Sequence, residues 1–303
     1  MNDRSDQNII VVGASGNLGR PLINTLYTKN LNYISLSKSG KSNSIKFNVE
    51  NEDISSIVKI KRGDVVIMLA AHSDQKWINE NPQMSRKLNV EGTLRLIDQI
   101  NKYMADLVFI SSEAVFGFES NSIHGWNEKA LTKPMSLYGK QKAEVENYIT
   151  NIGNGCIIRT GWNVPQNSID RCIVKTMHKE LLQRNSCYAD DAFLTLTNVE
   201  ETANAIALCI EHKIKGILHV ASKKVSRSKI ADTIIKYSKY SKDMQYQKVK
   251  YIELKGQMNR ANNAILDSRR TIEYLNLNIS APEDTIRKKV LILEDMLDKF
   301  KGN

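Results

Sequence analysis

A tyrosine and a lysine four positions apart form the pair of residues with the clearest chemical use in this chain. Tyr138 and Lys142 share one face of a predicted helix, since positions i and i+4 lie above one another. A lysine ammonium beside a phenol favours the phenolate, so we expect the pKa of Tyr138 to fall from its usual value of ~10. Such a tyrosine can give a proton to a carbonyl oxygen while hydride reaches the carbon. Ser112, at the end of an apolar segment, is expected to hold the same oxygen by a hydrogen bond.

A glycine-rich turn near the N-terminus predicts a site for the pyrophosphate of a dinucleotide. The turn follows an apolar run at 8–13 and opens a helical stretch at 18–29. Glycines let the backbone approach a pyrophosphate closely, and the helix N-terminus supplies free N–H groups. The residues expected to contact the cofactor here are Gly13, Ser15, Gly16, Asn17, Leu18 and Gly19.

The end of the second predicted strand, 33–37, favours one of the two nicotinamide dinucleotides. Folds that prefer NAD place an acidic residue at this point, where it binds the ribose 2′-hydroxyl. This chain has Ser37 and Lys38 instead, and a lysine there can neutralise a 2′-phosphate. We therefore predict NADP(H) in preference to NAD(H), with a solvated loop lysine as the alternative. Asn48 and Val49, which end the third predicted strand, are expected at the adenine edge.

Apolar runs alternate with helical patterns through the first half of the chain. The predicted strands are 8–13, 33–37, 44–49, 64–70, 107–111 and 155–159, and the predicted helices are 18–29, 53–60, 82–103 and 136–149. This alternation predicts an α/β, Rossmann-type doubly wound parallel sheet with a smaller, mostly helical C-terminal substrate lobe. We expect the NADP(H)-binding domain at 1–165, with about 190–222 returning to it. The substrate lobe is expected at about 166–189 and 223–303.

The composition of the chain narrows the class of protein. It has 303 residues, of which 41% are hydrophobic and 25% charged, and no apolar run long enough to span a membrane. Four cysteines without a CxxC pair predict a reduced, cytoplasmic protein and no metal site. The net charge is +10, but the lysines are scattered and no nucleic-acid motif accompanies them. We therefore expect neither a nucleic acid nor a membrane as a partner.

Several stretches, in the same order along the chain, resemble the extended short-chain dehydrogenase/reductase superfamily. Within it, the chain is similar to the dTDP-4-dehydrorhamnose reductase-like, epimerase/dehydratase-related group. The matching stretches are GASGNLG (13–19), LAAHSD (69–74), ENPQMSRKLNVEGT (80–93), SSEAVFG (111–117), SLYGKQKAEVE (136–146), IIRTGWNV (157–164) and LTNVEETANAI (196–206). The resemblance implies that Ser112, Tyr138 and Lys142 are catalytic, and that the cofactor is contacted by Leu69, Ala70, Ala71, Asn89, Tyr138 and Lys142. It implies substrate contacts from His72, Ser112, Glu113, Ala114 and Trp162. A homodimer is common in the family, and the sequence leaves the oligomeric state open.

Two departures from related enzymes shape the expected reaction. The family's 4,6-dehydratases need an Asp-Glu pair after the catalytic hydroxyl, but this chain has Glu113 and Ala114. Ala114 also replaces the cysteine of the family's epimerase-reductases. We therefore expect an NADPH-dependent reductase of a nucleotide-linked 4-keto deoxysugar. The alternatives are a nucleotide-sugar epimerase that retains NAD, and a non-catalytic NADP-binding regulatory subunit.

His178 is expected on a helix surface.

Overall fold

A computed structural model describes residues 7–117, 123–168, 170–254 and 263–301. The chain divides into two compact units. The first comprises Met1–Val115, Thr132–Arg159 and Ala203–Leu218, and the second comprises Phe116–Leu131, Thr160–Thr202 and His219–Asn303. The segment that returns to the first unit is thus shorter than the expected 190–222. The reason is that the strand Phe193–Asn198 pairs with other strands of the second unit and not with the central sheet.

A seven-stranded sheet has the strand order β10-β6-β5-β4-β1-β2-β3. Its strands are β1 (Ile9–Val12), β2 (Tyr33–Ser37), β3 (Ile45–Lys46), β4 (Val65–Met68), β5 (Asp106–Ser112), β6 (Gly155–Thr160) and β10 (Gly216–Val220). Pairs β1–β2, β1–β4, β2–β3 and β4–β5 are parallel. All residues of β1 and β4 are buried, as expected for parallel strands covered on both faces. The predicted Rossmann-type sheet is confirmed.

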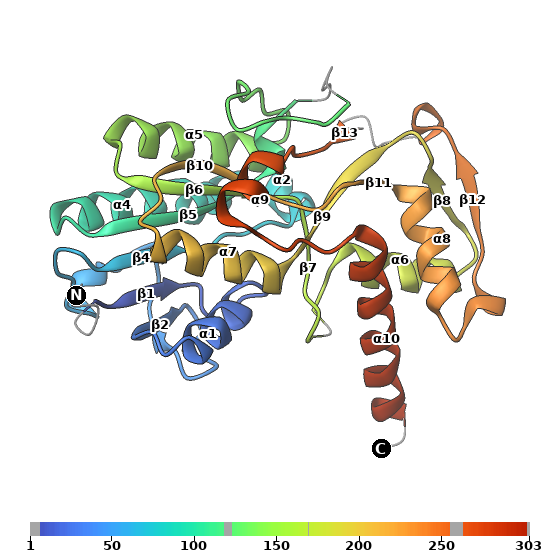
Figure 1. Ribbon diagram of the computed structural model, residues 1–303, viewed down its shortest axis with the longest axis horizontal. Coiled ribbons are helices and arrows are strands. Elements are labelled where there is room, and N and C mark those ends of the chain that lie inside the picture. The colour runs from blue at the N-terminus through green and yellow to red at the C-terminus, as the bar shows by residue number, and fades with distance from the viewer. Residues whose placement is uncertain (1–6, 118–122, 169, 255–262, 302–303) are drawn as a thin grey trace. The chain divides into compact units, whose positions relative to one another are not determined.

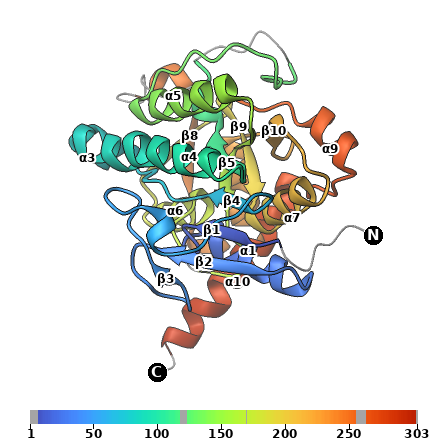
Figure 2. The same cartoon turned by 90° about the vertical axis from the view of Figure 1, so that its left-hand side faces the viewer.

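Helices cover both faces of this sheet (Figures 1 and 2). Helices α4 (Thr93–Lys102) and α5 (Leu137–Ile152) lie on one face, and α1 (Gly19–Thr28) and α7 (Val199–Glu211) lie on the other. Within the described part of the chain, no helix is long and apolar enough to cross a membrane. The carboxyl ends of β1, β4 and β5 lie along one edge of the sheet because these neighbouring strands are parallel. Ligands of doubly wound sheets bind at this edge.

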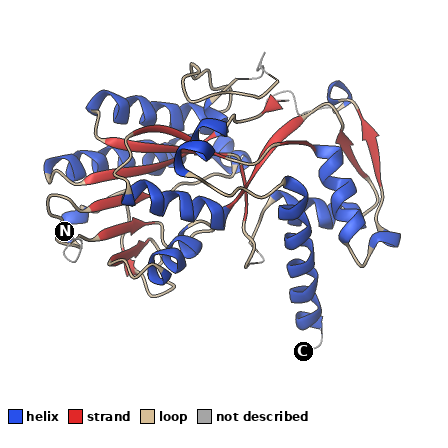
Figure 3. Cartoon of the chain, in the orientation of Figure 1, coloured by secondary structure: helices blue, strands red, loops and turns tan. Residues whose placement is uncertain are grey.

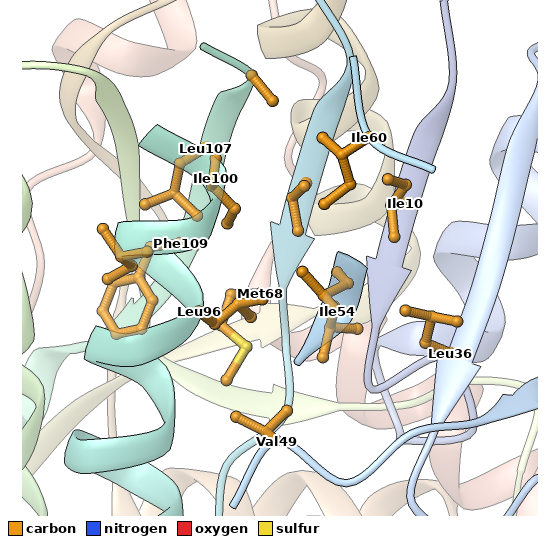
Figure 4. Packing of buried hydrophobic residues seen from close by; sticks show 14 of the residues in the cluster. Ile10, Leu36, Val49, Ile54, Ile60, Met68, Leu96, Ile100, Leu107 and Phe109 are labelled. Atoms are coloured by element: carbon orange, nitrogen blue, oxygen red, sulfur yellow. The ribbon is translucent and has the colours of Figure 1, made fainter. Parts of the chain in front are cut away.

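Alternate strand residues form the hydrophobic core beneath α4 and α5. Ile10, Met68 and Phe109 belong to one buried cluster with Leu96 and Ile100 of α4, and Figure 4 shows these side chains together. Successive strand residues point to opposite faces, so one face of each strand supplies this cluster. The core therefore fixes α4 and α5 against the strands whose ends carry the predicted site.

Two predicted helices differ from those observed. Segment 53–60 contains only a short 3-10 turn, Ile54–Ser56. Segment 82–103 is divided into α3 (Pro82–Arg86), a π-helical turn (Lys87–Gly92) and α4. A Cβ at Gly92 would lie 2.5 Å from the Val49 carbonyl oxygen, and the Thr93 hydroxyl bonds the Leu88 carbonyl at 3.0 Å. The π-helical turn, which is wider than an α-helical one, thus accommodates the close approach of Gly92 to the Val49 backbone. The helical periodicity of the sequence does not reveal this contact.

The second unit combines helices with short strands (Figure 3). Its helices are α6 (Ile173–Leu182), α8 (Arg227–Tyr237), α9 (Arg269–Leu275) and α10 (Pro282–Lys301), and its strands are β7 (Trp162–Val164), β8 (Ser186–Ala189), β9 (Phe193–Asn198), β11 (Lys224–Ser226), β12 (Tyr246–Val249) and β13 (Asn263–Ala264). Helices α6, α8 and α10 pack together around an apolar cluster. His178 is buried there and bonds Glu294 at 2.8 Å, so its expected place on a helix surface is wrong. Its helix faces two others, which the sequence of α6 alone does not show.

Candidate active site

Helix α5 begins at Leu137, one residue before the predicted proton donor Tyr138. The side chain of Ser136 caps the helix by accepting a hydrogen bond from the Gly139 N–H at 3.0 Å. Tyr138 is therefore in the first turn, and Lys142 lies one turn later on the same face. Gly153, with a φ of 74°, ends the helix in the left-handed conformation. Local capping signals thus set both ends of the element that carries the YxxxK pattern.

The first turn of α5 touches the segment that follows β5. A Cβ added at Gly139 would lie 1.9 Å from the carbonyl oxygen of Ala114, which leaves no room for a side chain. Ala114 belongs to a 3-10 turn, Glu113–Val115, that directly follows Ser112. This backbone contact brings the start of α5, with Tyr138, against the residues that follow Ser112.

Lys142 is buried beside the tyrosine but bonds the backbone. Its ammonium donates to the Ile110 carbonyl oxygen at 2.8 Å. It lies 4.4 Å from the centroid of the Phe109 ring and 5.9 Å from that of the Tyr138 ring. Burial lowers the pKa of Lys142 to about 8, and the nearby charge of Glu146 opposes this change. A lysine with that pKa is mostly charged at neutral pH.

The pKa of Tyr138 moves in the direction opposite to the prediction. Burial raises this pKa above its usual value, and the charge of Glu113 raises it further. The prediction considered the lysine charge alone, whereas desolvation of the phenolate is the larger effect. A raised pKa keeps the phenol protonated at neutral pH, which is the form that a proton donor requires.

Ser112 forms a hydrogen bond with the carboxyl group next to it. Its hydroxyl donates to Oε2 of Glu113 at 2.8 Å and accepts from the Ala114 N–H at 3.2 Å. Burial raises the pKa of Glu113 to about 7, and the Ser112 bond counteracts that rise. The sequence placed Glu113 among the substrate contacts but did not reveal its bond to Ser112.

The glycine turn between β1 and α1 has the close packing that the sequence predicts. Gly13 has a φ of 98°, and a Cβ there would lie 2.7 Å from the Ala70 nitrogen. A Cβ at Gly19 would lie 2.4 Å from the Gly13 carbonyl oxygen. The residue before α1, Leu18, makes no side-chain capping bond, so the first-turn N–H groups are not occupied by that cap. These features fit the pyrophosphate of a dinucleotide.

Lys38 has an acidic partner that the sequence analysis missed. Its ammonium bonds Oε1 of Glu50 at 2.5 Å. The Ser37 hydroxyl is buried, lies 2.6 Å from that of Ser44, and accepts from the Gly40 N–H at 3.1 Å. Glu50 stands 12 positions after Lys38 and reaches it because it follows the third strand of the same sheet. The observed parallel pairing of β2 with β3 explains this contact, since it brings the segments after the two strands together.

Near the predicted adenine edge, the Asn48 side chain accepts from the Glu50 N–H at 3.2 Å. Val49 is buried in the core cluster, and its carbonyl oxygen accepts from Arg95 at 2.7 Å. The adenine contacts of Asn48 and Val49 remain predictions.

Asn89 organises the loop after β4. Its Oδ1 accepts from the His72 N–H at 2.8 Å, and its Nδ2 donates to the His72 carbonyl at 2.9 Å and to Gln141 at 2.8 Å. Gln141 in turn donates to Ser85 at 2.9 Å. The Asn89 amide thus ties this loop to α5, and its predicted cofactor contact remains a prediction. The His72 ring stacks on Trp77, with ring centroids 3.8 Å apart.

The remaining predicted residues lie in different places. Leu69 and Ala70 follow β4, and their N–H groups both donate to the Val12 carbonyl, at 2.9 and 3.1 Å; Ala71 comes next, before the His72 loop. Ser15 in the glycine turn accepts from Arg20 at 2.8 Å, and Asn17 lies in the same turn. Trp162 belongs to the second unit, with the Arg227 guanidinium 5.2 Å from its ring centroid.

Comparisons with known proteins agree with this arrangement of elements. The dTDP-4-keto-6-deoxy-D-glucose reductase of Streptomyces niveus is 23% identical over 215 residues, which cover 70% of this chain and 72% of the relative. The matches to other curated relatives span about half of their length.

Solved structures match over almost the whole chain. A dTDP-4-dehydrorhamnose reductase from Clostridium acetobutylicum has a TM-score of 0.80 at 24% identity, covering 95% of this chain and all of the other. The reductase of that name from Bacillus anthracis, in complex with NADP, has a TM-score of 0.78 at 19% identity, covering 94% and 99%. A UDP-glucose 4-epimerase from Thermotoga maritima, with UDP-glucose, reaches 0.80 at 19%, covering 96% and 100%. These likenesses show the fold and do not separate reductases from epimerases.

The family model described as the RmlD substrate binding domain matches residues 7–291. This range includes the glycine turn, Ser112, the YxxxK pattern and most of the second unit. The chain therefore belongs to the RmlD substrate-binding domain family, within the short-chain dehydrogenase/reductase superfamily of NAD(P)-dependent enzymes.

Proposed function

We propose that this protein is an NADPH-dependent reductase of a nucleotide-linked 4-keto deoxysugar, similar to dTDP-4-dehydrorhamnose reductase. The observation that carries the proposal is the contact between the first turn of α5 and the turn after β5. It brings Tyr138 close to the residues beside Ser112, at the same sheet edge as the glycine turn. Family membership supports the proposal.

The residues of the site have complementary roles in this reaction. Reduced dinucleotide, when bound, supplies hydride to the keto carbon. Tyr138 gives its phenolic proton to the keto oxygen, so the ketone gains one hydride and one proton and becomes an alcohol. Ser112 donates a hydrogen bond to the same oxygen. Lys142 places a positive charge beside the tyrosine, which stabilises the phenolate left after proton transfer.

A substrate screen tests the proposal directly. Purified protein is mixed with NADPH and a panel of nucleotide-linked 4-keto deoxysugars, and loss of NADPH absorbance is followed together with alcohol product. We expect turnover with at least one member and no NADPH consumption with the matching 4-hydroxy sugar. If the purified protein instead carries tightly bound NAD and interconverts UDP-hexoses, the epimerase alternative replaces this proposal.

The Lys38–Glu50 pair gives a prediction about cofactor choice. In the Lys38→Ala variant we expect the KM for NADPH to rise roughly tenfold, with the KM for NADH nearly unchanged, because one charged contact to the 2′-phosphate is lost. In the Glu50→Gln variant the lysine loses its carboxylate partner, so the KM for NADPH should fall. Steady-state kinetics with both dinucleotides measure these effects.

The matched control for this pair is Lys29→Ala, at an exposed lysine just after α1. This change should leave both KM values within about twofold of wild type, because a screened surface charge contributes little. Equal increases in both KM values for Lys38→Ala would contradict a contact with the 2′-phosphate.

A further inference from the structure

The hydrogen bond between Ser112 and Glu113 poses a problem for the proposed reaction. A serine hydroxyl has one proton, and in the structure it is directed at Oε2 of Glu113. The Ala114 N–H donates to the same oxygen, so Ser112 already accepts one bond. In this arrangement the hydroxyl has no proton left to donate to a keto oxygen.

Protonation of the carboxyl group reverses the bond. A protonated Glu113 becomes a donor, so its O–H can point at the Ser112 oxygen. The serine proton is then released and can point toward a substrate oxygen. Burial gives Glu113 a pKa of about 7, so both forms are populated near neutral pH.

The charged groups around Glu113 are consistent with a proton on it. Helix α5 packs against its turn and presents Tyr138 and Lys142. The Lys142 ammonium donates to Ile110, and Glu146, farther along α5, is paired with Arg159. Within the residues that the structure describes, no cation forms a salt bridge with Glu113. The charge of an ionised Glu113 also raises the pKa of Tyr138, so the two acids interact electrostatically.

We propose that Glu113 is a positioning residue whose protonation turns the Ser112 hydroxyl toward the substrate, so that only the protonated form supports carbonyl reduction. The inference rests on the proposed reductase function and gives it a specific pH dependence. No oxidant or further reactant is involved, because the carboxyl proton moves only within its hydrogen bond to Ser112.

The Glu113→Gln variant provides the main test. Its amide N–H donates to the Ser112 oxygen at every pH, so it imitates the protonated acid. In the wild type we expect kcat for reduction to fall with a midpoint at about 7, because Glu113 loses its proton there. In the variant we expect the fall to shift to about 8, where Lys142 titrates. Relative to their ratio at low pH, the variant should gain roughly fivefold to tenfold over wild type at about pH 8.

Two further variants separate positioning from a structural role. Glu144→Gln changes an exposed glutamate of α5 that pairs with Arg86, and should keep the wild-type profile. Glu113→Ala removes both the acceptor and the donor, so its rate should lose the fall with a midpoint at about 7 and should stay below that of Glu113→Gln, because no group then directs the Ser112 hydroxyl. A Glu113→Gln profile with the wild-type midpoint, merely lowered in amplitude, would overturn the proposal.

An infrared titration tests the proposal without any substrate. The difference spectrum between wild type and Glu113→Gln should show the stretch of a protonated carboxylic acid that disappears with a midpoint near neutral pH. In Ser112→Ala that band should shift in frequency, because its hydrogen-bond partner is gone. Absence of the band at mildly acidic pH refutes the role of Glu113. If the band behaves as expected but no keto-sugar is reduced, the Glu113–Ser112 bond stands and the reductase function fails.

Discussion

Replacement of Tyr138 by phenylalanine is expected to lower kcat for carbonyl reduction by roughly 10²–10⁴-fold, the usual contribution of a positioned general acid. The change removes one oxygen and keeps the ring against the buried Lys142, so the fold and the dinucleotide site should be preserved. The Kd for NADPH should therefore stay within about threefold of wild type. Single-turnover rates measure the chemical step, and fluorescence titration measures the binding.

The matched control is Tyr148→Phe, on the same helix. The hydroxyl of Tyr148 bonds the exposed side chain of Asp98, away from the residues of the site. This variant should retain nearly full turnover. If Tyr138→Phe reduces the keto-sugar within a few-fold of wild type, Tyr138 is not the proton donor and the mechanism fails.

The second large effect concerns the buried ion pair below the site. Glu146 and Arg159 are both buried, and their side chains form bonds of 3.0, 3.2 and 2.6 Å. Glu146→Leu removes the carboxylate partner of a buried guanidinium, so we expect the free energy of unfolding to fall by about 3–5 kcal/mol. Denaturant titration followed by circular dichroism measures this loss.

The same pair also acts on Lys142, the predicted partner of Tyr138. Tyr138, Lys142 and Glu146 recur every four residues along α5, and the charge of Glu146 raises the pKa of Lys142. The variant Glu146→Gln should therefore lower that pKa further. Because the proposed mechanism needs the charged lysine, the double variant Glu113→Gln, Glu146→Gln should lose activity at a lower pH than Glu113→Gln alone.

Two controls test the interpretation of the stability loss. The exposed pair of Arg86 and Glu144 should lose less than ~1 kcal/mol when Glu144 is changed to glutamine. The double variant Glu146→Leu, Arg159→Met removes both charges and should recover most of the stability. A single Glu146→Leu variant as stable as wild type would show that Arg159 finds compensation elsewhere.

Local patterns predicted the elements that position the site. The glycine turn after β1, the serine at the end of β5 and the YxxxK pattern on α5 have strong short-range signals, and the structure places them at one sheet edge. Strand–helix alternation was enough to predict the sheet.

The features that the sequence did not predict depend on contacts between distant segments. Glu50 and Lys38 follow two neighbouring strands and form an ion pair. The Asn89 amide forms hydrogen bonds with the His72 backbone and with the Gln141 side chain. The predicted direction of the Tyr138 pKa shift was wrong, because burial raises this pKa and the degree of burial cannot be judged from a motif. The strands of the second unit are short and pair partly with far segments, which weakens their periodic signal.

Gly139 has no side chain, and this limits which substitutions related sequences can accept near the site. Because the carbonyl oxygen of Ala114 fills the space where a Cβ would stand, an inserted methyl group would push the helix and its phenol away from the sheet. Natural variants of this architecture should therefore alter their chemistry by exchanging residues 113 and 114, while position 139 stays invariant. When a saturation library at these three positions is scored for folded protein, the first two should tolerate exchange and the third should not.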